Sequence, residues 1–185
     1  KDTPNFIANH IGLYGVVHLM RALETGQYTI EEIDAITGPA LGRPKSATFR
    51  TMDIAGLDVF EHVLRNLQTR MPEDTASSGF TLPPLVAELV RLGWTGEKAG
   101  QGFYKREGKD ILTLEPTTKT YRPKQSARIP SLDAVKGVDD VNERVRTLFA
   151  AKDKAGDLLR DTLAPLLVYA AAVAPSIAYS IDDVD

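Results

Sequence analysis

FIANHIGLYGVVHLMRALETG occupies residues 6–26, and its apolar residues recur with the period of an α-helix. Asp2 or Thr3 can cap this helix, Pro4 can stand in its first turn, and Gly26 ends it. The sequence therefore predicts that the chain opens on a long helix. Its apolar stripe is expected to contain Phe6, Ile7, Ile11, Tyr14, His18, Leu19 and Ala22.

Further helices are predicted on the C-terminal side of this one. Thr29 begins a capping box, in which the carboxylate of Glu32 can bond back to the cap, and this helix is expected to end near Thr37. Ser46 and Thr48 are candidate caps for a short helix toward residue 54. Amphipathic spacing predicts two more helices, at 58–68 and 85–92, with a polar loop at 71–79 between them.

The middle of the chain changes character at residue 93. Residues 93–102 contain four glycines, which argues against a helix. Two short apolar runs, 103–105 and 111–114, flank a polar turn at 107–109 and predict a small β-hairpin. Residues 115–130 contain three prolines and no periodicity, so we expect an extended linker there.

The last segment is again helical, with helices predicted at 138–150 and 157–174. Pro165 is expected to kink the second of these or to mark its start. IEEID at 30–34 matches IDDVD at 181–185 in residue type at every position, which suggests a duplicated helical unit whose second copy is cut short. The chain is therefore predicted to be all-α with one hairpin. We expect a helical domain at 1–104, a hairpin and linker at 105–137, and a partial second repeat at 138–185.

Composition excludes several classes of function. The 185 residues carry a net charge of −3, which argues against a general nucleic-acid binder. The absence of cysteine excludes disulfides and thiol chemistry and fits a reducing compartment, so we expect a cytoplasmic protein. We expect no membrane span, because no apolar run reaches the roughly 18–20 residues that a span needs and the longest, 163–177, contains two prolines. The opening KDTP is expected to be a cut inside a longer protein.

No complete active site is visible in these residues. The three histidines lack metal-ligand spacing, so no metal site is expected. The sequence contains no dinucleotide-binding G-x-G-x-x-G, no phosphate-binding loop and no nucleophile elbow. The pattern alone thus indicates a helical domain without its own catalytic centre.

Two residues and one charged range are candidates for binding. Asn9 can donate to a carbonyl or hydroxyl of a ligand, or it can form an interhelical hydrogen bond. Lys98, in the glycine-rich loop, can meet a phosphate or carboxylate, or it can be a solvated surface lysine. Residues 105–128 carry seven basic against three acidic side chains, which could steer a polyanion such as coenzyme A or could simply keep a linker soluble.

Four ordered motifs resemble one family. KDTPNFIANH at 1–10 is similar to the Asp-Thr-Pro-Gly-Phe-Ile-x-Asn-Arg signature that opens the C-terminal helical domain of 3-hydroxyacyl-CoA dehydrogenases. The acidic helix start at 29–34, DIAGLD at 53–58 and GWTGEKAGQGFY at 93–104 are similar to the motifs that follow. Residues after 104 resemble the linker and half of the second helical repeat of long multifunctional members. Asn5 and His10 depart from the family pattern, and GRPKSATF at 42–49 departs from it in a way that suggests a bacterial multifunctional subtype with different substrate contacts.

The resemblance implies a function for the parent protein. Such enzymes oxidise the 3-hydroxyl of a 3-hydroxyacyl-CoA with NAD, which an N-terminal Rossmann domain binds beside a catalytic His–Glu pair. The motif Asn falls on Asn9 and implies a hydrogen bond to the substrate oxygen, and the motif Lys falls on Lys98 and implies contact with NAD. A homo-oligomer and a neighbouring enoyl-CoA hydratase domain are also implied. The alternative function is that of a non-catalytic helical dimerisation or docking module.

Overall fold

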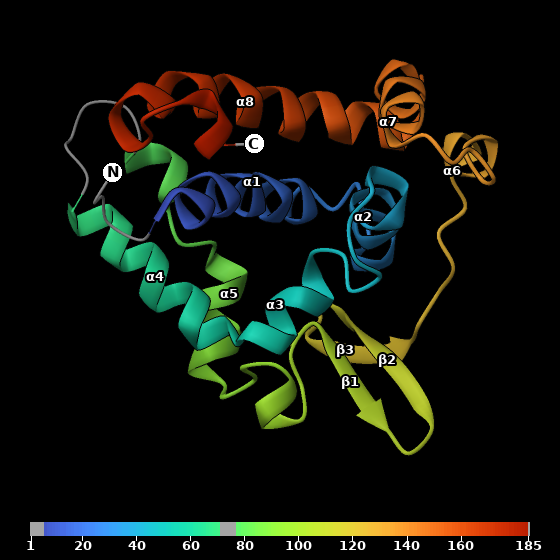
Figure 1. Ribbon diagram of the computed structural model, residues 1–185. Coiled ribbons are helices and arrows are strands. Elements are labelled where there is room, and N and C mark those ends of the chain that lie inside the picture. The colour runs from blue at the N-terminus through green and yellow to red at the C-terminus, as the bar shows by residue number, and fades with distance from the viewer. Residues whose placement is uncertain (1–5, 71–76, 185) are drawn as a thin grey trace.

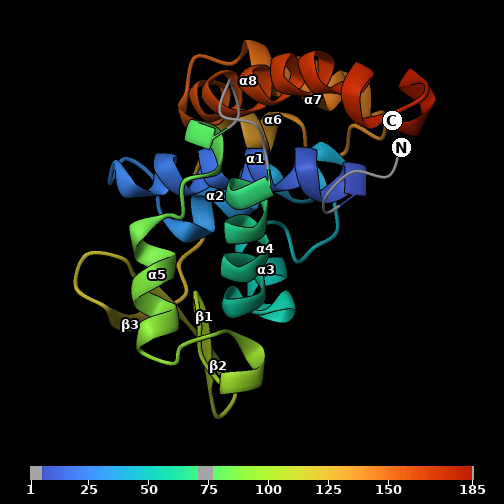
Figure 2. The same ribbon diagram turned by 90° about the vertical axis from the view of Figure 1, so that its left-hand side faces the viewer.

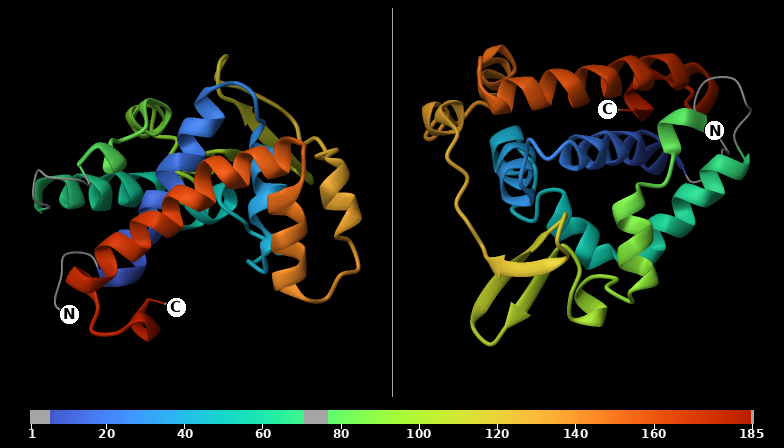
Figure 3. Two further views of the ribbon diagram at one scale, coloured as in Figure 1. Left: turned by 90° about the horizontal axis from the view of Figure 1, so that it is seen from above. Right: turned by 180° about the vertical axis from the view of Figure 1, so that it is seen from behind.

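The computed structural model of the chain describes residues 6–70 and 77–184. The fold is mostly helical, as expected, and α1 (Phe6–Glu24) lies at its centre (Figure 1). α8 (Lys154–Ile177) runs along one side of α1, and the view from above in Figure 3 shows it lying over that helix. α4 (Leu57–Arg70) and α5 (Pro84–Arg91) lie on the opposite side (Figure 2). The expected caps Asp2 and Thr3, with Pro4 and Asn5, lie outside the described residues.

α1 is buried on more than one face, which corrects the predicted stripe. Leu19 is buried as predicted, but Phe6 is 80% exposed. The reason is that α8 and the short 3₁₀ segment η2 (Ser77–Phe80) cover different faces of the helix. The buried residues of α1 are His10, Gly15, Val17, Leu19, Met20 and Leu23.

The capping box of α2 (Ile30–Thr37) is confirmed. The Glu32 N–H donates to the Thr29 hydroxyl at 3.2 Å, and the Thr29 N–H donates to the Glu32 carboxylate at 2.9 Å. Both bonds are local, which is why the sequence pattern predicts them.

For α3 (Phe49–Ala55), Thr48 occupies the predicted N-cap position, but neither Ser46 nor Thr48 caps the helix with its side chain. Asp34 of α2 caps this helix, because its Oδ1 accepts the backbone N–H groups of Thr48 and Phe49 at 3.0 and 2.8 Å. The Thr48 hydroxyl instead bonds the Thr37 hydroxyl at 2.8 Å. The other oxygen of Asp34 accepts the Tyr104 hydroxyl at 2.7 Å, so one carboxylate joins α2, α3 and the sheet.

The predicted hairpin is confirmed and extended. β1 (Tyr104–Glu107) and β2 (Asp110–Glu115) pair antiparallel, and β3 (Thr120–Pro123) adds a third strand in order β1-β2-β3. The expectation of an extended linker at 115–130 is therefore wrong over β3. Arg122 of this strand forms a bidentate pair with buried Glu31, at 2.6 and 3.0 Å. The sequence does not predict this strand, because four residues are too few to show a strand period and the contact is long-range.

Asp53 of α3 anchors the glycine-rich loop. Its two carboxylate oxygens accept the N–H groups of Phe103 and Tyr104 at 2.9 and 2.8 Å. A Cβ at Gly102 would lie 2.1 Å from the Asp53 Oδ1, so this close approach requires glycine. The loop is thereby joined to the end of β1.

The C-terminal region differs from the prediction at its helix ends. α6 (Pro130–Ala134) was not predicted, and α7 spans Val141–Ala150. α8 begins earlier than expected because Asp153 caps it, accepting from the N–H groups of Ala155 and Gly156. The helix then continues through Pro165 and Pro175, so Pro165 does not mark its start.

α8 also corrects the expectation about apolar length. By length and composition this 24-residue helix could cross a bilayer, a test that buried helices of other proteins also pass. Leu158 and Leu159 of α8 are buried, and the helix packs on α1 and α7.

The internal echo extends to local structure. Asp183 accepts the Ser180 N–H at 3.0 Å, as Glu32 accepts that of Thr29. Ile181, however, is 68% exposed, whereas Ile30 is fully buried. The two segments therefore share a cap but not an environment.

Candidate functional site

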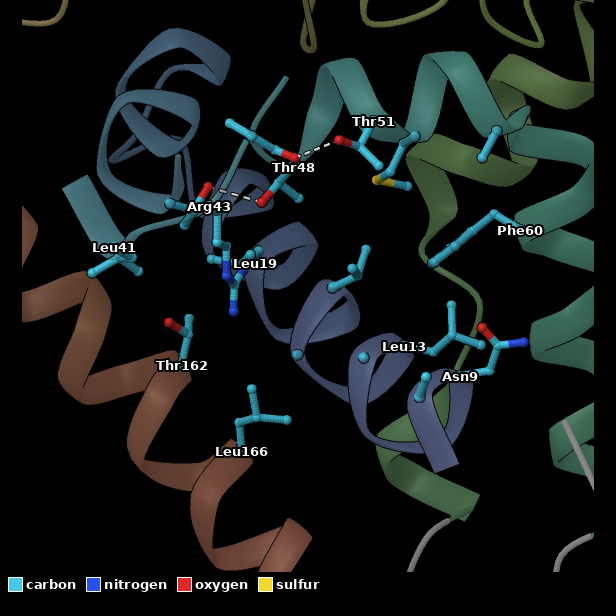
Figure 4. A pocket seen from close by; sticks show the side chains of 18 of the residues that line it. Asn9, Leu13, Leu19, Leu41, Arg43, Thr48, Thr51, Phe60, Thr162 and Leu166 are labelled. Atoms are coloured by element: carbon cyan, nitrogen blue, oxygen red, sulfur yellow. Dashed lines mark hydrogen bonds between the residues drawn. The ribbon is translucent and has the colours of Figure 1, made fainter. Parts of the chain in front are cut away.

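A groove of about 490 Å³ lies between α1, α3, α4 and α8 (Figure 4). Its volume falls within the usual range for small-molecule sites. Its walls are mostly apolar, with side chains from all four helices. Among them are Leu13, Leu19, Met52, Phe60, Leu163 and Leu166.

Small residues of α1 form the floor of the groove. Gly12 leaves open space, because a Cβ there would meet nothing within 4 Å. At Gly15 a Cβ would lie 3.1 Å from the Leu166 Cδ2 of α8, so this glycine lets α8 approach closely. Together these residues allow a channel along α1 without separating α8 from it.

The hydroxyl groups in the groove already have partners. Thr37, Thr51 and Thr162 each donate to the carbonyl four residues earlier, at 2.7–2.8 Å. Thr48 is hydrogen-bonded to Thr37. These four threonines add polarity without offering a free hydroxyl proton to a ligand.

Asn9 lies on α1 at one end of the groove, and it is exposed (Figure 4). Within 6–70 and 77–184 its amide has no hydrogen-bond partner, so the interhelical bond of the alternative interpretation is not seen. The neighbouring His10 is buried and meets the Phe80 ring edge-to-face, with centroids 6.3 Å apart. Of the described residues of this motif, Ala8 and Asn9 line the groove, and Asn9 is the polar one.

Arg43 lines the other end of the same groove. The sequence analysis does not identify it as a binding residue. It is the one charged residue among the described residues that line the groove. Burial lowers the pKa of its guanidinium, although the residue as a whole is exposed. The sequence treats it only as a departure from the family motif, because the groove depends on α8, more than a hundred residues away.

Lys98 is not brought together with Asn9. It lies in η3 (Glu97–Ala99), and its Nζ donates to the Asp58 carboxylate at 2.6 Å, which lowers the pKa of Asp58. Neither residue of this exposed pair lines the groove. Asn9 and Lys98 therefore lie in different parts of the fold, and one donor of the Lys98 ammonium is bound to Asp58.

The basic range 105–128 is partly neutralised by the fold. Arg122 is paired with Glu31, and Lys119 lies 3.0 Å from the Glu88 carboxylate. Lys105 and Lys124 line a second cavity of about 930 Å³ between α2 and the sheet, which also contains acidic side chains. The range is therefore not a continuous cationic surface.

Comparison with known proteins points to one family. A model described as 3-hydroxyacyl-CoA dehydrogenase, C-terminal domain, matches residues 6–106, which contain Asn9, Arg43 and Lys98. A probable 3-hydroxyacyl-CoA dehydrogenase of Bacillus subtilis (strain 168) is 43% identical over 185 residues, covering 100% of this chain and 23% of that protein.

Two further relatives carry related names. A probable 3-hydroxyacyl-CoA dehydrogenase of Deinococcus radiodurans is 46% identical over 123 residues, which is 66% of this chain and 34% of that protein. A putative fatty acid oxidation complex trifunctional enzyme of Rickettsia felis is 25% identical over 192 residues, which is 100% of this chain and 25% of that protein. The chain thus spans about a quarter to a third of the length of these relatives.

Proposed function

The chain belongs to the 3-hydroxyacyl-CoA dehydrogenase family, whose C-terminal domain it contains. On this premise we propose that it closes over a 3-hydroxyacyl-CoA in an NAD-dependent dehydrogenase. In this proposal the Asn9 amide donates to the 3-oxygen of the substrate. The observation that carries it is an amide that has no partner among the described residues and lies at one end of a mostly apolar groove.

The position of Asn9 suits a donor to a ligand. An amide donates without bringing a full charge into an apolar site. Asn9 is exposed at the groove, so a substrate oxygen can reach it without unfolding the helix. Such a donor is most effective when negative charge develops on the oxygen in the transition state.

The remaining chemistry is assigned to an N-terminal Rossmann domain. NAD, bound mainly there, accepts the hydride, and a His–Glu pair accepts the hydroxyl proton. Residues 1–185 contain no dinucleotide-binding motif that could replace that domain. We assign Lys98 a contact with the cofactor, for which its ammonium has donors beyond the one that binds Asp58.

The proposal includes a wider assembly. The trifunctional name of the Rickettsia relatives supports a multidomain parent, to which we assign an enoyl-CoA hydratase domain and a cytoplasmic location. We further propose that the parent forms a homo-oligomer. Leu167 and Val168 of α8 are 60% and 71% exposed, and this apolar surface favours a dimerisation or docking role as the second candidate function.

Substitution of Asn9 tests the main proposal. In the complete polypeptide that carries this chain, Asn9→Ala is expected to lower kcat by ~10²–10³, as for loss of one oxyanion donor. Asn9→Asp is expected to be at least as damaging, because it places a negative charge against the developing oxyanion. The free energy of unfolding should change little, since Asn9 has no partner among the described residues.

Asn142→Ala provides a matched control, because Asn142 is an exposed asparagine on α7 outside the groove. It should leave kcat unchanged. The contradicting outcome is a normal kcat together with a lowered melting temperature in the same preparation of Asn9→Ala. That outcome would show that Asn9 has a structural role and is not part of the active site.

A further inference from the structure

Two donors that have no partner among the described residues lie at opposite ends of the groove. One is the Asn9 amide and the other is the Arg43 guanidinium, which has no hydrogen bond or ion pair within the described parts of the chain. Figure 4 shows Arg43 extending into the groove beside Leu19, with Asn9 at the far end of α1. The groove is therefore mostly apolar, and each of its two ends carries a donor that is free among the described residues.

The fold holds Arg43 in this position. Gly42, at φ 76°, ends the 3₁₀ segment η1 (Pro39–Leu41), and a Cβ there would lie 3.0 Å from Val141 of α7. The neighbouring cation Arg144 donates to the Ala40 carbonyl at 3.2 Å and to the Val138 carbonyl at 2.6 Å. Arg144 thus fastens the turn to α7, while Arg43 keeps its guanidinium for another group.

The unpaired guanidinium indicates what the far end of a ligand should carry. A guanidinium beside apolar walls is stabilised by an anion, and its planar shape matches a carboxylate in a bidentate pair. No acidic side chain lines the groove within the described residues, so an anion that pairs with Arg43 there would come from a ligand. One guanidinium suits one carboxylate better than the several charges of a diphosphate.

The length of the groove sets the length of the ligand. Asn9 and Leu19 are ten residues apart on α1, which is about 15 Å of helix. An extended chain advances roughly 1.2 Å per bond. About a dozen bonds therefore separate a group at Asn9 from a group at Arg43.

We propose that Arg43 binds a carboxylate at the distal end of the acyl chain, so that the groove selects ω-carboxylated 3-hydroxyacyl-CoA substrates. This rests on the proposed function, which places the 3-oxygen at Asn9. Arg43 is then a specificity residue that touches the substrate far from the reacting carbon.

The test compares two thioesters of equal length, 3-hydroxyhexadecanedioyl-CoA and 3-hydroxyhexadecanoyl-CoA, which differ only at the distal end. Their Kd values, by calorimetry, and their kcat/KM values with NAD are measured on the complete polypeptide. The wild type is expected to favour the ω-carboxylated thioester by about tenfold to a hundredfold, the range for a hydrogen bond to a charged group. Because each ratio is taken within one variant, a change in the folded fraction does not alter it.

Three variants locate the effect. Arg43→Met should bring the ratio to one or below, and Arg43→Lys should keep only part of it, because an ammonium lacks the bidentate fork. Lys45→Met removes an equal charge two residues away, outside the groove, and should leave the ratio unchanged.

The outcomes separate the possible errors. A wild-type ratio near one, or a ratio that Arg43→Met does not change, would overturn the inference. Equal weakening of both thioesters in Arg43→Met would place a phosphate of coenzyme A at Arg43 and would also overturn it. A preserved Kd ratio without turnover of either thioester would refute the dehydrogenase proposal and leave the carboxylate site standing.

Discussion

On the side of the molecule that faces the sheet, the Arg122 guanidinium donates two hydrogen bonds to the buried Glu31 carboxylate, with N···O distances of 2.6 and 3.0 Å. On the side that faces the groove, Arg43 has apolar walls and no partner among the described residues. Arg122 lies in the short strand β3, and Arg43 lies just after the 3₁₀ segment η1. Neither element is predicted from the sequence. The difference teaches that a charge satisfied by the chain holds the fold together, whereas a charge left unsatisfied beside a cavity is available to a ligand.

The largest expected effect is on the sheet side. Arg122→Met leaves the Glu31 carboxylate buried without its cation, which typically costs ~3–5 kcal/mol of unfolding free energy. Urea unfolding of the purified chain measures this loss. Arg43→Met is the matched variant on the groove side and should change the same quantity by less than about 0.5 kcal/mol. Equal losses in the two variants would erase the distinction between the two sides.

Two buried carboxyls sharpen the comparison through pH. Burial alone would raise the pKa of Glu31, but hydrogen bonds from Arg122 and the Gln125 N–H lower it to about 2. Burial raises the pKa of Asp53 to about 6, although the N–H groups of Phe103 and Tyr104 act in the opposite direction. The stabilisation from Glu31 is therefore present above its unfolded pKa and lost as pH falls toward 2.

The contribution of Asp53 to stability changes with pH in the opposite direction. Its contribution is complete below its unfolded pKa and is lost as pH rises toward 6. These two groups together predict greatest stability near about pH 4–5. Urea midpoints across this range should fall on both sides, and Glu31→Gln should flatten the acid limb alone. A midpoint that rises steadily from pH 4 to pH 7 would contradict the assignment for Asp53.

A small effect on stability is also expected at the exposed pair of Lys98 and Asp58, which belongs to neither side. Lys98→Met should change the unfolding free energy by ~1 kcal/mol or less, because exposed ion pairs contribute little. If Lys98 contacts NAD as proposed, the KM for NAD should rise while stability stays nearly constant. Asp58→Asn is the control, since it frees Lys98 and should not raise that KM.

Much of the fold could be predicted because its signals are local. The capping box at Thr29 uses residues three apart, and the hairpin of β1 and β2 uses a polar turn between two apolar runs. Asn9 and Lys98 could be named as candidates through motif resemblance, but their separation in space could not. The motif gives order along the chain and says nothing of the Asp58 contact that holds Lys98 away from the groove.

The features that escaped prediction depend on distant partners. β3 is held by the bond from Arg122 to Glu31, 91 residues apart, and four residues are too few to show a strand period. The cap of α3 comes from Asp34 rather than from the residue before the helix. Arg43 acquires its meaning only when α1 and α8 form the walls around it.

The bonds of Asp34 also bear on the order in which the chain assembles. Two of them reach only 14 and 15 residues along the chain, whereas the bond from Tyr104 closes a segment of 70 residues. The entropy lost on closing a loop grows with its length, so the corner between α2 and α3 is expected to form before the sheet docks on it. Tyr104→Phe should then act mainly on the unfolding rate, while Asp34→Ala should also slow folding. A single side chain thus ties an early event in folding to a late one.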